Sequence, residues 1–404
     1  MDYAIPTQVF IYLTNLIDTT FSTGDISKYL AFIPIFLIGF ISSFLLTPII
    51  GRIAWKYKIT YKPKEKRKNK EFDNPQKALH DIETPALGGL AVMIPAFIIM
   101  ILCFQLNSFT IPILIAFSIL IIGSVLDDIL NLDSRIQFIY QLLACLVIVF
   151  SIIDLSQIGI IGNEILNLSA YTLSFKFLGL SLSLALPGDI ILFFWLFLCI
   201  NAVKWVAGSP GLVESCATII FLLLFVIGVR TFSIFSSTIS IVIAGSLIAF
   251  LYFAIPPQKI MSGSPGKSVF GFTIALLALI SNSKFSTSLM ILGLPLLDAI
   301  FVVIRRIIVH KPKSLVELMK INDTTHFHHQ LIKLGFSRRQ ILLVESAVTF
   351  LLGSIAIATT GAMRYFAFIF GITLILFLIA IINYKANKRE AKKKTDSPES
   401  KYSY

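Results

Sequence analysis

A series of long apolar runs constrains this sequence more than any other feature, because each run is about as long as a bilayer is thick. An apolar helix of about 20 residues crosses the hydrocarbon of a membrane. The 404 residues are 56% hydrophobic and only 14% charged, whereas a soluble domain is about a quarter charged. We therefore predict an all-α polytopic membrane protein. Eleven runs are candidate transmembrane helices, near residues 31–51, 85–105, 109–126, 136–154, 188–206, 211–229, 235–254, 268–281, 287–308, 340–359 and 362–384.

The basic residues predict how this bundle is oriented. The run GRIAWKYKITYKPKEKRKNKEFDNPQK after the first span, residues 51–77, has ten basic residues against three acids, and the C-terminal segment YKANKREAKKK is also basic. Cytoplasmic loops carry an excess of Lys and Arg, so both segments should be cytoplasmic. Eleven crossings then place the N-terminus outside and the C-terminus inside. Membrane topology thus explains the net charge of +12, and we expect no nucleic-acid partner.

With this orientation, most polar residues that could do chemistry lie on the cytoplasmic face. We expect one transmembrane domain over residues 1–384 and a charged, disordered cytoplasmic tail over 385–404. The outer loop 155–187 could form a short β-hairpin over the bundle. The predicted cytoplasmic loops are 52–84, 127–135, 207–210, 255–267 and 309–339.

Asp127 and Asp128 are adjacent carboxylates that directly follow a predicted span. Carboxylates at membrane depth are costly and usually functional. Neighbours on a helix point about 100° apart, so one could face a central cleft while the other binds a neighbouring element. The alternative is a pair of solvated residues at a helix C-terminus, where acids are unfavourable.

The sequence GSPG occurs twice, at 208–211 and 263–266, each time near a lysine, Lys204 or Lys267. It is not a P-loop, because the residue six before the second lysine is Met261 and the flanks are membrane spans. Glycine and proline instead predict turns between spans. A glycine there would let backbone amides approach an anion at the start of the next helix. The alternative for Lys267 is a loop lysine attracted to anionic lipid.

Three of the five histidines lie in HFHHQL, residues 326–331. On a helix His326 and His329 would share a face, whereas His328 would not. The cluster could coordinate a metal or bind phosphate, and a solvated loop cluster is the alternative. His80 precedes the second span and would be unremarkable alone.

Asp298 lies inside a predicted span and therefore needs a partner within the bundle. Arg305 and Arg306 stand at the cytoplasmic end of the same span. They either follow the general excess of positive charge on that side or contact phosphate.

These motifs, in this order, resemble those of the polyprenyl-phosphate N-acetylhexosamine-1-phosphate transferases, which form glycosyltransferase family 4. The family includes phospho-MurNAc-pentapeptide transferase and undecaprenyl-phosphate GlcNAc-1-phosphate transferases, and the resemblance covers about residues 30–385. It implies an enzyme of a bacterial inner membrane with ten or eleven spans. It also implies that polyprenyl phosphate attacks the β-phosphorus of a UDP-sugar, releasing UMP, with Mg²⁺ as cofactor. A homodimer or a partner membrane enzyme is a further expectation.

The resemblance also implies roles for individual residues. Asp127, Asp128 and His326 would be catalytic, with Asp127 as a metal ligand. The residues expected to bind phosphate or substrate are His80, Asn201, Lys204, Lys267, Arg305, His328 and His329.

The chain departs from the family pattern at the acids. The family run N-A-V-N-x-x-D-G-x-D-G-L reads NAVKWVAGSPGL here, with Lys204 for Asn and with Ala207 and Pro210 for the two Asp. The later G-D-x-G-S has Ser264 for Asp and Lys267 for Ser. Three acids lost and two lysines gained change the formal charge by about +5. One charge about 4 Å away is worth roughly 4 kcal/mol at an effective dielectric of 20, so Mg²⁺ affinity should be depressed.

Three hypotheses remain open from the sequence. The chain is a transferase in which Lys204 and Lys267 replace Mg²⁺ as a phosphate clamp. Alternatively, it is a non-catalytic relative that binds a lipid phosphate or a partner enzyme, or it uses the fold as a transporter. Glu214 is the one new acid near the altered motif, and we do not expect it to restore a metal site.

Overall fold

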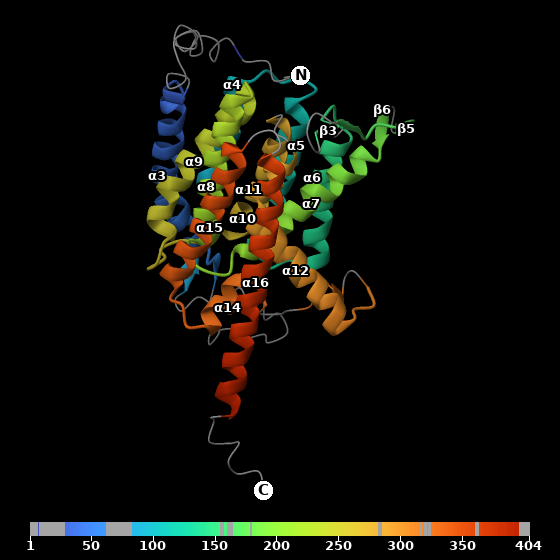
Figure 1. Ribbon diagram of the computed structural model, residues 1–404. Helices are drawn as coiled ribbons and strands as arrows, with labels where there is room; N and C mark the ends of the chain where they lie inside the picture. The colour runs from blue at the N-terminus through green and yellow to red at the C-terminus, as the bar shows by residue number, and fades with distance from the viewer. Residues whose placement is uncertain are drawn as a thin grey trace.

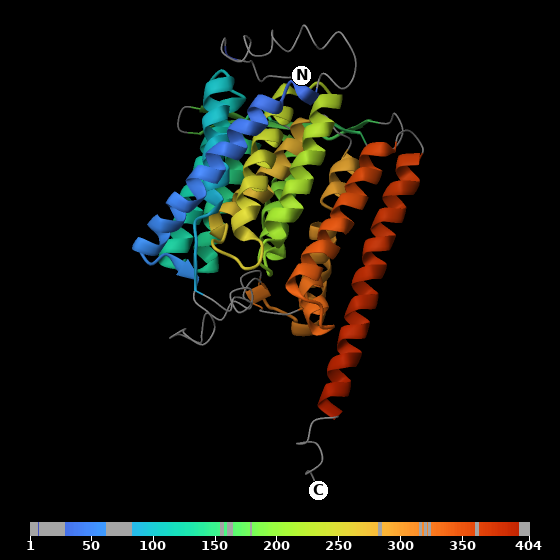
Figure 2. The same ribbon diagram turned by 90° about the vertical axis from the view of Figure 1, so that its left-hand side faces the viewer.

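The structure is a computed structural model that describes most of the chain. The described residues are 7, 29–61, 83–153, 157–159, 165–177, 180–281, 285–314, 317–318, 321, 325–359 and 363–395. Within them the regular structure is almost entirely helical, and the helices run side by side as one bundle (Figures 1 and 2). The prediction of an all-α polytopic membrane protein is therefore confirmed.

Every predicted apolar run contains a helix. Eight helices are long and apolar enough to cross a membrane, whereas α4 and α6 are shorter apolar helices. The number of crossings and the orientation stay predictions. The helices are α3 (Ile33–Lys56), α4 (Gly89–Cys103), α5 (Thr110–Leu130), α6 (Ser134–Val149), α7 (Gly188–Val206), α8 (Leu212–Arg230), α9 (Ile234–Ala254), α10 (Gly263–Ile280), α11 (Phe285–Ile291), α12 (Gly293–His310), α14 (Phe327–Lys333), α15 (Arg338–Ala358) and α16 (Met363–Thr395).

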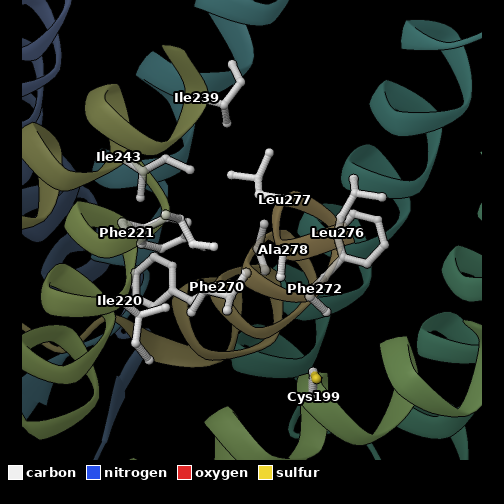
Figure 3. Close-up of a cluster of buried hydrophobic side chains, with 14 of the residues drawn as sticks. Cys199, Ile220, Phe221, Ile239, Ile243, Phe270, Phe272, Leu276, Leu277 and Ala278 are labelled. Carbon is white, nitrogen blue, oxygen red and sulfur yellow. The ribbon is translucent and has the colours of Figure 1, made fainter. Parts of the chain in front are cut away.

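Helices α8, α9 and α10 form the centre of the bundle, with more than four-fifths of their apolar stretches buried, against 17% for the outer helix α16. Figure 3 shows part of this core, where Phe270 and Leu277 of α10 lie among Phe221 of α8 and Ile243 of α9. Small residues allow the closest approach. A Cβ added at Gly39 of α3 would lie 2.2 Å from the Val242 carbonyl oxygen of α9, as is common between membrane helices.

Three predicted boundaries are wrong, and two of them concern candidate site residues. Helix α5 continues to Leu130, so Asp127 and Asp128 lie in its last turn and not in a loop. Helix α10 begins at Gly263, so the second GSPG forms its first turn. Proline is favoured in a first turn because its missing N–H has no intrahelical partner there.

The third wrong boundary is at the C-terminus. Helix α16 continues to Thr395, so residues 385–395 are helical where a disordered tail was predicted. The helix extends well beyond the other helices (Figures 1 and 2). The run predicted as one span near 287–308 is also interrupted, by the break between α11 and α12.

Short strands complete the fold. Two antiparallel hairpins form within residues 155–187, the loop predicted to lie outside: β3 (Gln157–Gly159) with β4 (Ile165–Asn167) and β5 (Tyr171–Phe177) with β6 (Leu180–Leu186). The predicted hairpin is thus confirmed. At the other end of the bundle, β1 (Thr60–Tyr61) pairs with β2 (Thr84–Pro85) and positions the residues that follow α3.

Candidate functional site

Most of the polar residues singled out by the sequence belong to segments at one end of the bundle, the end opposite the β5–β6 hairpin (Figure 1). The last turns of α5, α7 and α12, the first turn of α10, the loop before α8 and the short helix α14 contribute them. The structure brings them together as two regions. We call these the aspartate network, centred on Asp127 and Asp128, and the histidine cluster, centred on His326 and His328.

Asp127 is buried, with 7% of its surface exposed, and protein groups hold both of its carboxylate oxygens. Gln137 Nε2 of α6 donates to Oδ1 at 2.8 Å. Ser264 Oγ of α10 donates to Oδ2 at 2.7 Å. The serine that stands where the family has an acid therefore binds the first aspartate directly.

Asp128 binds different partners, as the helical offset between the two residues predicted. The backbone N–H of Ser264 donates to its two carboxylate oxygens at 3.0 and 3.1 Å. The hydroxyl of Tyr61 donates to Oδ1 at 2.7 Å. Burial, reinforced by Asp128, raises the pKa of Tyr61 well above its usual value, so the phenol remains a donor. Sequence reasoning missed Tyr61, because a tyrosine in a basic loop carries no signal of its function.

Both lysines of the altered motifs join this network. Lys204 of α7 donates to Gln137 Oε1, and Gln137 in turn donates to Asp127. Lys267 is buried in the first turn of α10, with its ammonium 5.5 Å from the centre of the Tyr61 ring. It interacts electrostatically with Asp128 and with the buried Glu214 of α8.

The donor set does not fit a preformed site for a divalent cation. Among the residues that the structure describes, no group of three or more His, Cys, Asp or Glu is arranged to hold a metal ion. All four carboxylate oxygens of Asp127 and Asp128 already accept hydrogen bonds from protein donors. Lys204 and Lys267 add positive charge to the same network.

Asn201, expected to bind substrate, is buried inside the bundle. Its amide nitrogen donates to Gln141 Oε1 at 3.1 Å and to the Phe197 carbonyl at 2.9 Å. These bonds tie α7 to α6. A substrate role for Asn201 stays a prediction.

The histidine cluster begins with the partner that Asp298 was expected to need. His326 Nδ1 lies 2.8 Å from Asp298 Oδ2. The N–H of Phe327 donates to Asp298 Oδ1 at 2.9 Å. One carboxylate from α12 therefore fixes both the His326 ring and the first turn of α14.

His328 packs against the first GSPG turn. A Cβ added at Gly208 would lie 1.9 Å from His328 Nε2, so only glycine leaves room for the ring. Burial lowers the pKa of His328 well below its usual value, and His329 and His326 lower it further. The imidazole is therefore neutral. Its Nε2 is buried and has no hydrogen-bond partner in the described part of the chain.

An aromatic row connects the cluster to the end of α12. The Arg306 guanidinium lies 5.5 Å from the centre of the Trp205 ring, and that ring lies 5.9 Å from the His326 ring. The sequence named Arg305 for phosphate binding, whereas the structure places Arg306 in this row. Because Trp205 directly follows Lys204, the last turn of α7 contributes to both regions.

His80 lies outside the described residues. The expected contribution of His80 to phosphate binding therefore stays a prediction.

The fold and the site define a multi-pass membrane protein with a polar centre at one end of its helix bundle. The sequence model of glycosyl transferase family 4 matches residues 109–282. A phospho-N-acetylmuramoyl-pentapeptide-transferase of Leuconostoc mesenteroides is 30% identical over 257 residues, 61% of this chain and 73% of that protein. The chain belongs to glycosyl transferase family 4.

Other relatives match over more of the chain. A probable undecaprenyl-phosphate N-acetylglucosaminyl 1-phosphate transferase of Bacillus subtilis is 26% identical over 85% of this chain and 89% of its own length. A decaprenyl-phosphate N-acetylglucosaminephosphotransferase of Mycobacterium leprae is 23% identical over 75% and 77%. The resemblance inferred from the motifs is thus confirmed at the level of the family.

Proposed function

We propose that this chain binds a polyprenyl phosphate and a UDP-sugar at the polar end of the bundle and transfers sugar 1-phosphate to the lipid. The membrane would be the bacterial inner membrane, with this end facing the cytosol. The names of the relatives support the class of lipid acceptor and of transferred group. The observation that carries the proposal is the Asp298–His326 pair, which joins α12 to the histidine cluster beside Trp205 and Arg306.

In the proposed reaction an oxygen of the lipid phosphate attacks the β-phosphorus of the UDP-sugar. A new P–O bond forms, the bond to UMP breaks, and a lipid-linked pyrophosphate sugar results. Because two anions must approach each other, positive groups have to stabilise the developing charge. Arg306 offers a permanent cation, and His326, oriented by Asp298, fits a role in proton transfer or phosphate contact. No step is assigned to Mg²⁺, because the aspartate network does not fit a preformed metal site.

An assay of the purified protein with radiolabelled UDP-GlcNAc and undecaprenyl phosphate, with and without EDTA, tests the proposal. We expect a lipid-linked product that forms in the presence of EDTA. Product that disappears with EDTA would contradict metal independence but not transfer. No product from any UDP-sugar tested would overturn transfer itself.

A second candidate is a non-catalytic relative that binds polyprenyl phosphate alone or together with a partner membrane enzyme. The closed hydrogen bonding of Asp127 and Asp128 favours it, because neither carboxylate keeps an oxygen without a protein donor. Retention of undecaprenyl phosphate by the protein, without product from any UDP-sugar, would support this candidate. A homodimer stays a prediction.

A further inference from the structure

We infer that Lys267 is an internal counter-ion, whose ammonium neutralises Asp128 and Glu214 within the protein and makes the aspartate network independent of any divalent cation. This differs from a lysine that clamps substrate phosphate. It concerns the charge balance of the folded protein and holds whether or not transfer takes place.

The position of Lys267 in α10 carries the first step. Ser264 and Lys267 are three residues apart in the same helix, so their side chains lie on one face. The N–H of Ser264 binds Asp128, and Tyr61, which also binds Asp128, lies under the Lys267 ammonium. Lys267 is only 8% exposed. Its charge is therefore directed into the protein.

The charge count carries the second step. By formal charge, the acids Asp127, Asp128 and Glu214 contribute three negative charges when ionised, against the two positive charges of Lys204 and Lys267. The N-terminus of α10 adds a partial positive charge of about one half beside Asp128. The network is therefore close to neutral without a metal. Burying any of these charges without its partner would be costly.

The short side chain of Ser264 carries the third step. Its hydroxyl fills the space beside Asp127 and donates a hydrogen bond, where a carboxylate would add a further negative charge. Ser264 and Lys267 thus act together. Ser264 lowers the negative charge of the network by standing in place of a carboxylate, and Lys267 adds a positive charge to it. Reversing both changes should create a need for a cation.

The first experiment measures the thermal midpoint of the purified protein in detergent, in EDTA and in MnCl₂. We expect the same Tm for the wild type in both conditions. We expect Lys267→Met to lower Tm by about 5 °C or more, since it leaves buried carboxylates unpaired. Adding Glu214→Gln to that variant should recover part of the loss. Lys259→Met is the matched control, because Lys259 is exposed and loses only its contacts with the Tyr252 and Phe253 rings, so Tm should fall much less than in Lys267→Met.

The second experiment measures Mn²⁺ binding by electron paramagnetic resonance. In the wild type we expect no tightly bound Mn²⁺. In the double variant Ser264→Asp, Lys267→Ser we expect about one Mn²⁺ per chain, bound at least tenfold more tightly than by the wild type. Tight Mn²⁺ binding by the wild type would overturn the inference, and so would a Lys267→Met variant as stable as Lys259→Met. The wild-type measurement decides the question even where a variant fails to fold. Neither readout requires transferase activity, so failure of the proposed function is recognised separately.

Discussion

The aspartate network and the histidine cluster lie at the same end of the bundle but differ in how completely their polar atoms are paired. In the network, Ser264, Gln137 and Tyr61 donate to all four carboxylate oxygens. In the cluster, His328 Nε2 is buried without a hydrogen-bond partner among the described residues. A buried polar atom without a partner is unusual in a folded protein and asks for a functional or structural reason. We therefore expect ligand chemistry to depend more on the cluster, and stability more on the network.

The largest expected effect is on the pair that anchors the cluster. Asp298→Asn removes the carboxylate that orients His326 and should reduce formation of lipid-linked product by about 100-fold, as loss of a positioned acid–base group does. The measurement is the radiolabel assay. Asp133→Asn is the matched control, because Asp133 is partly exposed at the start of α6 and its side chain makes no capping hydrogen bond. Equal activity of the two variants would contradict the expectation that ligand chemistry depends more on the histidine cluster than on the aspartate network.

The next effect tests the contact between the first GSPG turn and the cluster. Gly208→Ala places a Cβ 1.9 Å from His328 Nε2, so the buried ring has to move. Overpacking of this kind costs about 2 kcal/mol, which a lower Tm in detergent would report. Gly51→Ala is the control, because its Cβ meets only the Ile260 side chain at 3.4 Å. If Gly208→Ala is as stable as the control, His328 is not fixed by the turn.

A smaller effect concerns pH. The pKa of His328 in the folded protein lies well below its ordinary value of 6.5. The unfolded chain therefore binds the proton first as pH falls. The stability from the neutral ring is fully present above about pH 6.5 and decreases below it, by up to about 1.4 kcal/mol per pH unit. Tm should fall between pH 7 and pH 5, and His328→Gln should flatten that dependence. His310→Gln, at an exposed histidine, should leave it unchanged.

The sequence predicted what depends on local pattern and missed what depends on distant contacts. It predicted the bounds of α7 and the need of Asp298 for a partner, because apolar length and the cost of a buried charge are readable locally. It could not predict that Tyr61 binds Asp128, since 67 residues separate them. The early start of α10 had a signal in Pro265 that we did not use.

The structure corrects the sequence predictions at the end of α16 and extends them at Glu214, and both differences have physical reasons. The C-terminal extension of α16 contains no glycine or proline from residue 372 to 395, so nothing in that stretch ends the helix. Its charge nevertheless suggested disorder. Glu214 was not expected to restore a metal site, and in the fold it interacts electrostatically with Lys267. A new acid and a new lysine compensate each other only when tertiary structure brings them together.

The smallest expected effect sharpens the comparison from the side of the network. Ser264→Ala removes the hydroxyl that donates to Asp127 but keeps the backbone N–H that donates to Asp128. Because Gln137 still donates to Asp127, the loss should be about 1 kcal/mol, the net value of one hydrogen bond. Ser118→Ala in the same helix as Asp127 removes only a local bond to Leu114 and should leave Tm unchanged. Equal Tm values for the two variants would mean that the Ser264 hydroxyl does not help to hold α10 to α5, and the hydrogen bonding of the aspartates would then rest on Gln137, Tyr61 and the Ser264 N–H.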